Sequence, residues 1–355
     1  MSARKPEGDL KRGWTTGACA TAATAAAYQA LVTGAFPDPV TISLPRGEEP
    51  SFALSARELA DGAATAAVIK DAGDDPDVTH GAEIRVTLRP LAAGAGVRFR
   101  AGDGVGTVTK AGLPLPPGEP AINPGPRAMM TAAVTDLARR LKGPADVEIT
   151  VSIPGGQALA EKTMNGRLGI VGGLSVLGTT GVVIPYSCAS WIHAIHRGVD
   201  VARANGIAHI AAATGSTSEQ AVKKLYDLPD MALIDMGDFA GGLLKYLRRH
   251  PLPRLTLAGG FGKLAKLAQG HLDLHSARSS LDMARLSALA DDKIAAQKIA
   301  DANTGLEALQ IAGPALAARV AAGAREVALA ALAGDTEVEV LVYDRQGNLV
   351  GRAGG

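Results

Sequence analysis

The pattern of apolar and polar positions changes once along the chain, near residue 206. Before that point, runs with a helical period mix with short alternating or β-branched runs, in no repeating strand and helix order. The pattern predicts helices over residues 18–32 and 127–141, an irregular loop over 112–126, and strands over 40–44, 83–88, 96–100 and 147–153. We therefore expect the first part of the chain to be α+β.

From residue 206 onward, an apolar run, a small polar turn and a helical pattern follow one another repeatedly. The predicted strands are 207–213, 231–235 and 254–258, the turns 214–218, 236–238 and 259–262, and the helices 219–226, 239–249 and 263–268. Ala/Leu-rich helix is expected up to residue 334 and a strand over 337–343. This order is typical of a parallel α/β sheet, so we expect one domain over 1–195 and a second over 196–355.

The turns of the second domain predict a ligand site, because ligands of such sheets bind beyond the carboxyl ends of the strands. The turn from Thr214 to Ser218 offers hydroxyls and free amides for a phosphate, a carboxylate or a ribose, or it is only a helix cap. Asp235 or Asp238 could bind ribose hydroxyls or only stabilise a helix start. The candidates are Thr214, Gly215, Ser216, Gly237, Asp238 and Gly259, with Lys263 in reach of an anion.

Residues 70–81 concentrate acidic side chains and one imidazole in a short segment. A calcium loop is excluded, because counting from Asp71 the twelfth position is Ala82, where a bidentate Glu is needed. The segment either holds a base or stabilises charge, or it is a turn whose Asp side chains cap local amides. The catalytic candidates are Asp74, Asp75, Asp77 and His80. Near the start, Thr15 and Thr16 precede the Ala-rich helix and form either an anion site or a cap.

Composition excludes several classes of protein. The chain has 36 basic and 35 acidic residues, a net charge of +1, and only 3% aromatic residues, so we expect no nucleic-acid partner. Cys19 and Cys188 have no metal-ligand spacing, which favours a reducing cytoplasm and no metal site. Residues 168–192 lack charge, but their Gly and Pro content favours strand and loop over a membrane span. Residues 1–11 carry charges and no apolar stretch, so no signal peptide is expected.

Several blocks of the chain, taken together and in order, resemble the cobalt-precorrin-5B C(1)-methyltransferase family of the anaerobic cobalamin pathway. The likeness runs from Gly13 to about Ser276, and its most specific blocks are 14–17, 70–81, 102–106 with 121–124, and 163–181. Two positions depart from the expected pattern, Gly260 in place of His and Leu274 in place of Thr.

The resemblance implies transfer of a methyl group from S-adenosylmethionine to carbon 1 of cobalt-precorrin-5B, giving cobalt-precorrin-6A, with cobalt only in this tetrapyrrole substrate. It also implies a first α+β domain like a permuted ribosomal S5 domain 2 and a second, small parallel-sheet α/β domain. None of the predicted strand-to-helix turns of the second domain has the GxGxG loop of ordinary Rossmann methyltransferases, and the chain has no GPGD-type loop of other tetrapyrrole methylases. We expect an oligomer to be possible and no membrane partner.

On this basis we expect the methyl donor at the turns of the second domain and the corrinoid on the first. Hydroxyls would hydrogen-bond the corrinoid, and basic side chains would pair with its carboxylates. The residues assigned to the corrinoid are Thr15, Thr16, Arg127, Arg167, Ser175, Thr179, Thr180 and Lys263. Two alternatives remain, a nucleotide-dependent phosphotransferase, which the missing Walker lysine disfavours, and a non-catalytic tetrapyrrole carrier.

Overall fold

The computed structural model describes residues 8–355 and divides the chain into two compact units. The first unit ends at Ser187, and the second is Cys188–Gly355, whereas the sequence placed the division after residue 195. The division comes earlier because helix α4 (Cys188–Ala204) starts the second unit, and its buried Ile195 and Val199 belong to the core of that unit. The expectation of no signal peptide concerns residues 1–11, most of which lie outside the described residues.

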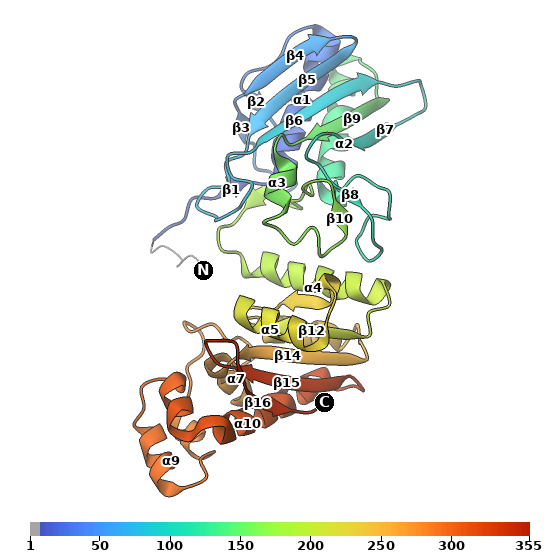
Figure 1. Ribbon diagram of the computed structural model, residues 1–355. Coiled ribbons are helices and arrows are strands. Elements are labelled where there is room, and N and C mark those ends of the chain that lie inside the picture. The colour runs from blue at the N-terminus through green and yellow to red at the C-terminus, as the bar shows by residue number, and fades with distance from the viewer. Residues whose placement is uncertain (1–7) are drawn as a thin grey trace. The chain divides into compact units, whose positions relative to one another are not determined.

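The first unit is a five-stranded sheet with helix α1 packed on it and helix α2 packed against α1 (Figure 1). The strand order is β4-β5-β6-β9-β7, in which β7 and β9 are parallel and the other pairs antiparallel. Burial alternates along β6, where Ile84, Val86 and Leu88 enter the core, as expected for a sheet with one covered face. The elements are α1 (Thr16–Thr33), α2 (Pro124–Leu141), β4 (Ala56–Ala60), β5 (Ala63–Ile69), β6 (Glu83–Pro90), β7 (Val97–Ala101) and β9 (Val147–Ser152).

Helix α1 lies between the sheet and α2 and is buried along most of its length. Its Ala side chains let three elements approach closely, and the buried hydroxyls of Thr21 and Thr24 donate to the carbonyls of Gly17 and Ala20 at 2.8 and 2.7 Å. Helix α2 starts at Pro124, so the loop predicted over 112–126 is wrong for its last three residues. Proline is favourable in a first helical turn, because its missing N–H has no intrahelical acceptor there.

Short two-stranded ribbons and one short helix complete the first unit. The segment 168–192, predicted as strand and loop, contains two of these strands and then enters α4 at Cys188, where the loop prediction is wrong. Among the described residues, no helix is long and apolar enough to cross a membrane. The ribbons are β1 (Gly13–Trp14) with β11 (Val182–Val183), β2 (Val40–Thr41) with β3 (Ser51–Phe52) and β8 (Thr107–Val108) with β10 (Ile170–Val171), and the helix is α3 (Gly156–Ala160).

The second unit is built on a sheet of strand order β13-β12-β14-β15-β16. The first four strands are parallel, as predicted, and β16 is an antiparallel strand that the pattern missed. The strands are β12 (His209–Ala213), β13 (Leu233–Asp235), β14 (Arg254–Gly260), β15 (Glu337–Tyr343) and β16 (Leu349–Ala353). The helices that follow α4 are α5 (Ser216–Tyr226), the 3-10 turn η1 (Asp230–Ala232), α6 (Ala240–Leu247), α7 (Phe261–Ala268), α8 (Met283–Ser287), α9 (Lys293–Ala300) and α10 (Gly305–Leu332).

The chain order places a switch point between β12 and β14. From β12 the chain moves to β13 on one side and then to β14 on the other, so the loops after β12 and β14 diverge. Helix α5 packs on one face of the sheet, and α4, α6, α7 and α10 belong to the core on the other face. The carboxyl ends of β12 and β14 therefore border an opening that neither layer fills.

Several predictions for this unit are wrong in detail. The predicted turn 259–262 does not exist, because Gly259 and Gly260 pair with β15 and α7 starts at Phe261. Residues 269–282 are not helical. After Gly270, with φ of 92°, the chain crosses the start of α6, where Leu272 accepts from the amide of Gly241 at 2.8 Å. Within α10, non-helical Gly313 before Pro314 marks a kink.

Candidate functional site

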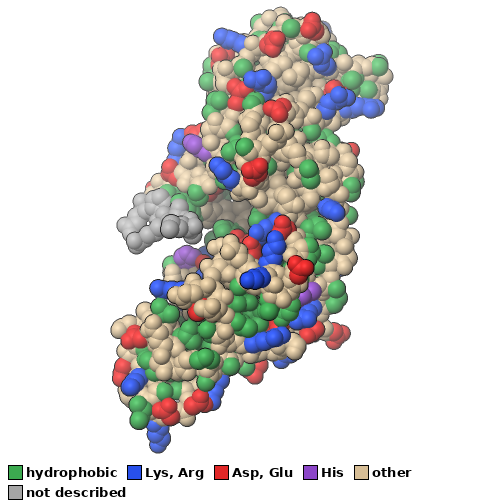
Figure 2. Space-filling model, viewed as in Figure 1, with side chains coloured by type: hydrophobic (Ala, Val, Ile, Leu, Met, Phe, Trp, Pro, Cys, Tyr) green, Lys and Arg blue, Asp and Glu red, His purple; other side chains and the backbone are tan. Residues whose placement is uncertain are grey.

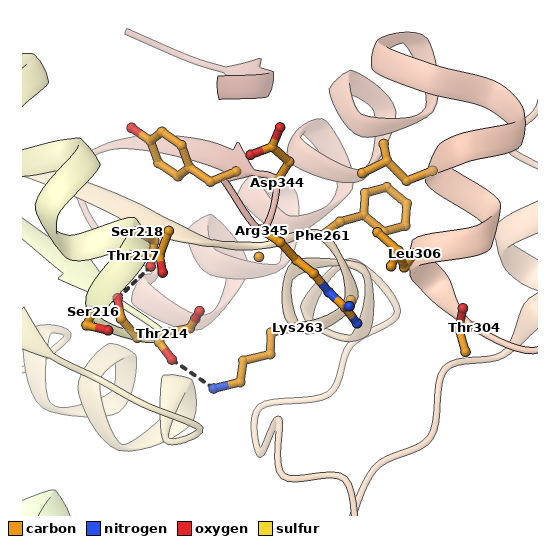
Figure 3. A pocket seen from close by; sticks show the side chains of 15 residues that line it. Thr214, Ser216, Thr217, Ser218, Phe261, Lys263, Thr304, Leu306, Asp344 and Arg345 are labelled. Carbon is orange, nitrogen blue, oxygen red and sulfur yellow. Dashed lines mark hydrogen bonds between the residues drawn. The ribbon is translucent and has the colours of Figure 1, made fainter. Parts of the chain in front are cut away.

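A pocket of ≈ 610 Å³ opens at the carboxyl ends of β12, β14 and β15, on the switch point of the sheet (Figure 3). One wall carries the hydroxyls of the turn after β12, and another carries the apolar side chains of α7 and α10. Pockets for small organic ligands have volumes of about 300–1,000 Å³ and few, well-placed polar groups. Its lining is Thr214, Gly215, Ser216, Thr217, Ser218, Gly260, Phe261, Gly262, Lys263, Thr304, Leu306, Leu309, Tyr343, Asp344 and Arg345.

The turn after β12 points the N-terminus of α5 at this pocket. The Thr214 amide donates to the carbonyl of Ala258 at 2.9 Å, which fixes the turn to β14. The first intrahelical bond runs from Glu219 to the carbonyl of Gly215 at 3.0 Å, so the amides before Glu219 are outside the helical ladder. The turn therefore presents N–H groups and hydroxyls to one wall of the pocket, which suits an anion or a ribose.

Lys263 joins the ends of neighbouring strands. Its ammonium donates to the carbonyl of Thr214 at 2.8 Å and lies 3.0 Å from the carboxylate of Asp238. These contacts connect the turns after β12 and β13 to the first turn of α7, which follows β14. The sequence assigned Lys263 to the corrinoid and Asp238 to the donor, and the structure pairs the two with each other.

The remaining donor candidates lie around the same turns. Thr214, Gly215 and Ser216 line the large pocket, whereas Gly237, with φ of 55°, lies against the ring of Trp191. Gly259 packs against Thr214, since a Cβ added to Gly259 would be 2.8 Å from the Thr214 hydroxyl. Asp238 lines a second pocket of ≈ 360 Å³, which shares Gly262 and Lys263 with the first. The second pocket also contains Lys266, Leu274, His275, Ser276, Leu281 and Gly305.

Sequence reasoning missed a further wall of the large pocket, formed by Tyr343 at the end of β15 and by Asp344 and Arg345 after it. The signal was present, because the strand over 337–343 was predicted and ligand-binding residues follow the carboxyl ends of parallel strands. The sequence argument rests on Gly-rich turns, and the residues after β15 contain no glycine before Gly347. Thr304, which caps α10 by accepting from the amide of Glu307 at 3.2 Å, was also missed.

In the first unit, the acidic segment 70–81 encloses a buried ammonium. Lys70 is 3% exposed, and its ammonium contacts the Asp77 carboxylate and the Thr79 hydroxyl. Burial raises the pKa of Asp77, but the Lys70 charge and the hydrogen bonds from Lys70 and Thr79 outweigh it and hold that pKa below its ordinary value. Asp77 is therefore ionised as the counter-charge of Lys70.

The other acidic candidates bond to backbone amides from distant parts of the chain. Asp74 accepts from the amide of Lys11 at 2.6 Å, and Asp75 accepts from the amide of Tyr186 at 2.8 Å. Nδ1 of His80 accepts from the amide of Ala72 at 3.1 Å, so this nitrogen carries no proton and the ring proton is on Nε2. The segment thus connects the start of the first unit to its last residues, and the imidazole is half exposed beside it.

The threonines assigned to the corrinoid come together at the N-terminus of α1. Thr15 caps the helix by accepting from the amide of Ala18 at 3.1 Å, and its own amide donates to the carbonyl of Gly181 at 2.9 Å. An added Cβ at Gly178 would be 2.2 Å from the Thr15 hydroxyl, which shows how closely segment 177–181 packs here. Thr16 is buried, Thr179 is exposed, and Thr180 bonds within its own turn around Val182.

The remaining corrinoid candidates lie at the edges of this region. Ser175 donates to the side chain of Asn165 at 3.2 Å, and Arg167 follows Asn165 in the segment that leads to β10. Arg127 holds the loop before α2, because its guanidinium donates to the carbonyl of Ile122 at 2.7 Å and to the carboxylate of Glu119 at 2.8 Å. Within residues 8–355 we find no group of three or more His, Cys, Asp or Glu side chains placed to bind a metal ion.

Charge over the visible surface is mixed. Figure 2 shows Lys and Arg interspersed with Asp and Glu on both units. The near-equal totals of 36 basic and 35 acidic residues agree with that distribution. An anionic ligand would therefore be held by particular side chains and amides, and long-range steering would contribute little.

Comparisons with known proteins cover nearly the whole sequence. The profile described as CbiD matches residues 3–185, and the profile described as CbiD, C-terminal domain, matches residues 273–354. A protein named cobalt-precorrin-5B C(1)-methyltransferase from Brucella anthropi is 58% identical over 97% of this chain and 96% of its own length. A protein of the same name from Bradyrhizobium sp. is 58% identical over 97% of this chain and 93% of its own length.

One solved structure is also similar, a cobalamin biosynthesis protein (CbiD) from Archaeoglobus fulgidus. Its sequence is 28% identical to this chain, and the alignment covers 77% of this chain and 84% of that one with a TM-score of 0.41. The family resemblance inferred from the sequence blocks is confirmed by the profile matches and by the two bacterial relatives.

Proposed function

Because the chain belongs to the CbiD family, we propose that it is the C-methyltransferase that acts on carbon 1 of cobalt-precorrin-5B in cobalamin biosynthesis, with S-adenosylmethionine as donor. The proposal rests first on the relatives of that name, which are 58% identical to this chain over nearly its full length. The product would be cobalt-precorrin-6A. S-adenosylmethionine would supply an activated methyl group, and cobalt would enter only within the substrate.

The observation that carries the donor assignment is the pocket on the switch point of the second sheet. Its volume of ≈ 610 Å³ lies within the range of about 300–1,000 Å³ for organic ligands. Thr214, Ser216 and Thr217 would hydrogen-bond the ribose, and the apolar side chains of Phe261, Leu306 and Leu309 offer a surface for the adenine. The residues present therefore fit a nucleoside with an amino-acid tail.

The acceptor is assigned to the first unit, where hydroxyls and glycines meet at the N-terminus of α1. Exposed Thr179 and partly exposed Thr15 and Thr180 can donate to a large flat ligand, and the glycines between them permit its close approach. Arg127 bonds Glu119 and two carbonyls, so we assign it to shaping the loop before α2. Arg167 is assigned to the carboxylates of the substrate, because a guanidinium can match a carboxylate with two parallel hydrogen bonds.

Methyl transfer depends mainly on how the donor and the acceptor are positioned. The nucleophilic ring carbon attacks the methyl carbon, the carbon–sulfur bond breaks, its electron pair stays on sulfur, and S-adenosylhomocysteine leaves. Holding the acceptor carbon, methyl and sulfur in line removes much of the barrier, so hydrogen bonds that orient both molecules are the main contribution of the protein. If the methylated ring loses a proton, Nε2 of His80 is a poor acceptor in the tautomer that the Ala72 hydrogen bond favours, because Nε2 then carries the ring proton.

An assay of methyl transfer tests the proposed function. The protein is incubated with methyl-labelled S-adenosylmethionine and cobalt-precorrin-5B, and we expect label in the corrinoid and one equivalent of S-adenosylhomocysteine. A carrier would bind the corrinoid without label transfer. A phosphotransferase would likewise leave the corrinoid unlabelled but would consume ATP in a parallel incubation, and either result would overturn the proposal. Heat-unfolded protein is the control for non-enzymatic transfer.

We further propose that the enzyme works in the cytoplasm, in line with its two free cysteines and the biosynthetic role named for its relatives. Neither nucleic acid nor membrane is proposed as a partner, and self-association remains a prediction. Gel filtration of the purified chain at several concentrations tests that prediction directly.

A further inference from the structure

The pocket on the switch point contains one charged side chain that has no hydrogen bond or ion pair within the described residues. Three charged side chains line it, Lys263, Asp344 and Arg345. Lys263 is neutralised by Asp238 at 3.0 Å and also donates to the carbonyl of Thr214. Its ammonium therefore already has partners within the protein.

The carboxylate of Asp344 is hydrogen-bonded within its own turn. It accepts from the amides of Gln346 and Asn348 at 2.9 and 2.8 Å and from the side-chain amide of Asn348 at 2.8 Å. Burial raises the pKa of Asp344, but these hydrogen bonds outweigh it and hold that pKa below its ordinary value. These hydrogen bonds fix the turn after β15. The backbone of Arg345, the next residue, is therefore held in place.

Arg345 has no hydrogen bond or ion pair with any residue in the described range 8–355, and it is exposed. Figure 3 shows its guanidinium among the lining side chains, between Lys263 and Leu306. A guanidinium presents a planar fork of donors that matches a carboxylate in two parallel hydrogen bonds. A carboxylate in this pocket would therefore meet a cation that is free to bind it.

We propose that Arg345 binds the carboxylate of the amino-acid part of the methyl donor, an inference that rests on the proposed function. The carboxylate is the only anionic group of S-adenosylmethionine, and Arg345 is the unpaired cation of the pocket. The adenine then takes the apolar wall of Phe261, Leu306 and Leu309, and the ribose takes the hydroxyls after β12. Arg345 is a specificity residue, because it distinguishes the complete donor from nucleosides that lack the amino acid.

Two ligands separate this role from general support of the pocket. S-adenosylhomocysteine has the carboxylate, and 5′-methylthioadenosine has the same nucleoside and sulfur without the amino acid. Calorimetry on Arg345→Gln should show S-adenosylhomocysteine binding weakened by about 10- to 100-fold, the usual effect of losing a charged hydrogen bond. Binding of 5′-methylthioadenosine should change less than twofold. Arg345→Lys should lie between, since it keeps the charge and loses the fork.

Arg249→Gln is the matched control, because Arg249 is exposed and lies outside the lining of this pocket. It should leave both affinities unchanged. Equal weakening of both ligands in Arg345→Gln, or no change in either, would overturn the inference while leaving the donor site in place. If the unaltered protein bound neither ligand, the proposed donor and with it the proposed function would be overturned.

Discussion

The ammonium of Lys263 lies 3.0 Å from the carboxylate of Asp238 and 2.8 Å from the carbonyl of Thr214, so one side chain holds together the turns after β12 and β13. We expect these turns to depend on each other. Lys263→Met should weaken S-adenosylhomocysteine binding more than Asp238→Asn does, because only the lysine also holds the Thr214 carbonyl. Calorimetry on both variants measures this difference.

The same pair predicts non-additive stability. Lys263 is 38% exposed, so water screens the pair, and we expect a coupling of about 1 kcal/mol between the two substitutions. Urea unfolding of the two single variants and the double variant measures the coupling. Strictly additive changes in the free energy of unfolding would mean that the ion pair contributes nothing.

Gly215→Val tests the donor pocket with little risk to the fold. Gly215 has φ of 169°, which is extended backbone, and a Cβ built there meets no atom within 4 Å. The valine would therefore occupy the pocket and should weaken S-adenosylhomocysteine binding by at least about tenfold, at an unchanged melting temperature. Gly334→Val, at a glycine outside the lining of the pocket whose Cβ also has room, is the control. Normal binding in Gly215→Val would remove the donor from this pocket.

Asp75→Asn and His80→Gln test whether the acidic segment takes part in catalysis. Both variants retain a hydrogen-bond acceptor for the amides of Tyr186 and Ala72, so we expect the loop to keep its shape. A catalytic role predicts that turnover falls by roughly a hundredfold or more while donor binding and melting temperature stay nearly unchanged. A lower melting temperature with near-normal turnover would instead assign these residues to loop structure.

Asp77 makes the first unit sensitive to acid. Its pKa in the folded protein is below the ordinary value of 3.8, so folding is stabilised above that value and loses this contribution as pH falls through it toward the folded pKa. The free energy of unfolding should therefore decrease between about pH 5 and pH 2. Asp77→Asn should flatten that slope and, by leaving buried Lys70 without its counter-charge, cost on the order of 3 kcal/mol at pH 7. An unchanged slope would show that another carboxylate dominates.

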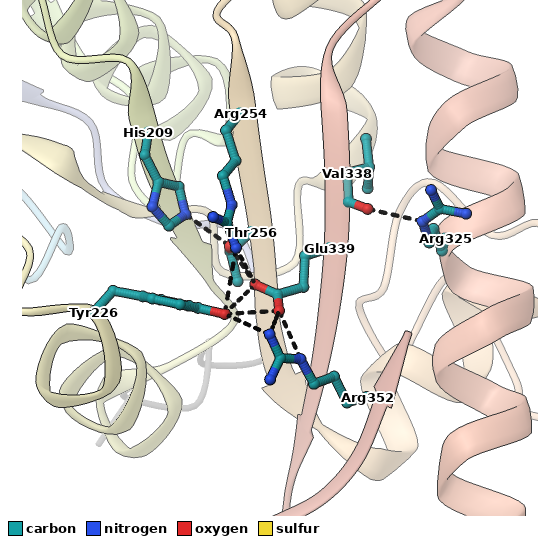
Figure 4. A network of polar contacts seen from close by, with 8 residues as sticks. All are labelled: His209, Tyr226, Arg254, Thr256, Arg325, Val338, Glu339 and Arg352. Carbon is teal, nitrogen blue, oxygen red and sulfur yellow. Dashed lines mark hydrogen bonds and ion pairs between the residues drawn. The ribbon is translucent and has the colours of Figure 1, made fainter. Parts of the chain in front are cut away.

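A buried carboxylate in the second unit should affect stability without affecting ligand binding. Glu339 is 0% exposed and accepts from Tyr226 at 2.7 Å, from Thr256 at 2.9 Å and from Arg352 at 2.8 Å (Figure 4). It precedes Tyr343 at the pocket by four residues, or about 13 Å along β15. Glu339→Gln should cost about 3 kcal/mol, because Arg254 and Arg352 lose their counter-charge. Affinity for S-adenosylhomocysteine in the folded protein should stay unchanged.

Local patterns determined the type and approximate position of the main elements. The Ala-rich run over 18–32 became α1 (Thr16–Thr33), and the strand, turn and helix repeat became a parallel sheet, because period and turn residues are properties of neighbouring positions. The same patterns selected Thr214, Gly215 and Ser216 for the pocket that the structure contains. Small ribbons such as β1 with β11 were missed, since two-residue strands have no period to detect.

Tertiary structure alone decided what each candidate side chain contacts. Lys263 reaches Asp238 and Asp75 reaches Tyr186 across 111 positions, because the fold, and not the spacing along the chain, sets those distances. Strand order places Arg345 in the pocket, because β15 lies beside β14 and the turn that follows β15 is therefore at the same edge of the sheet. A sequence can show that a residue is able to bind a charge, but whether that charge is already neutralised depends on which partners the packed chain brings within a few ångströms.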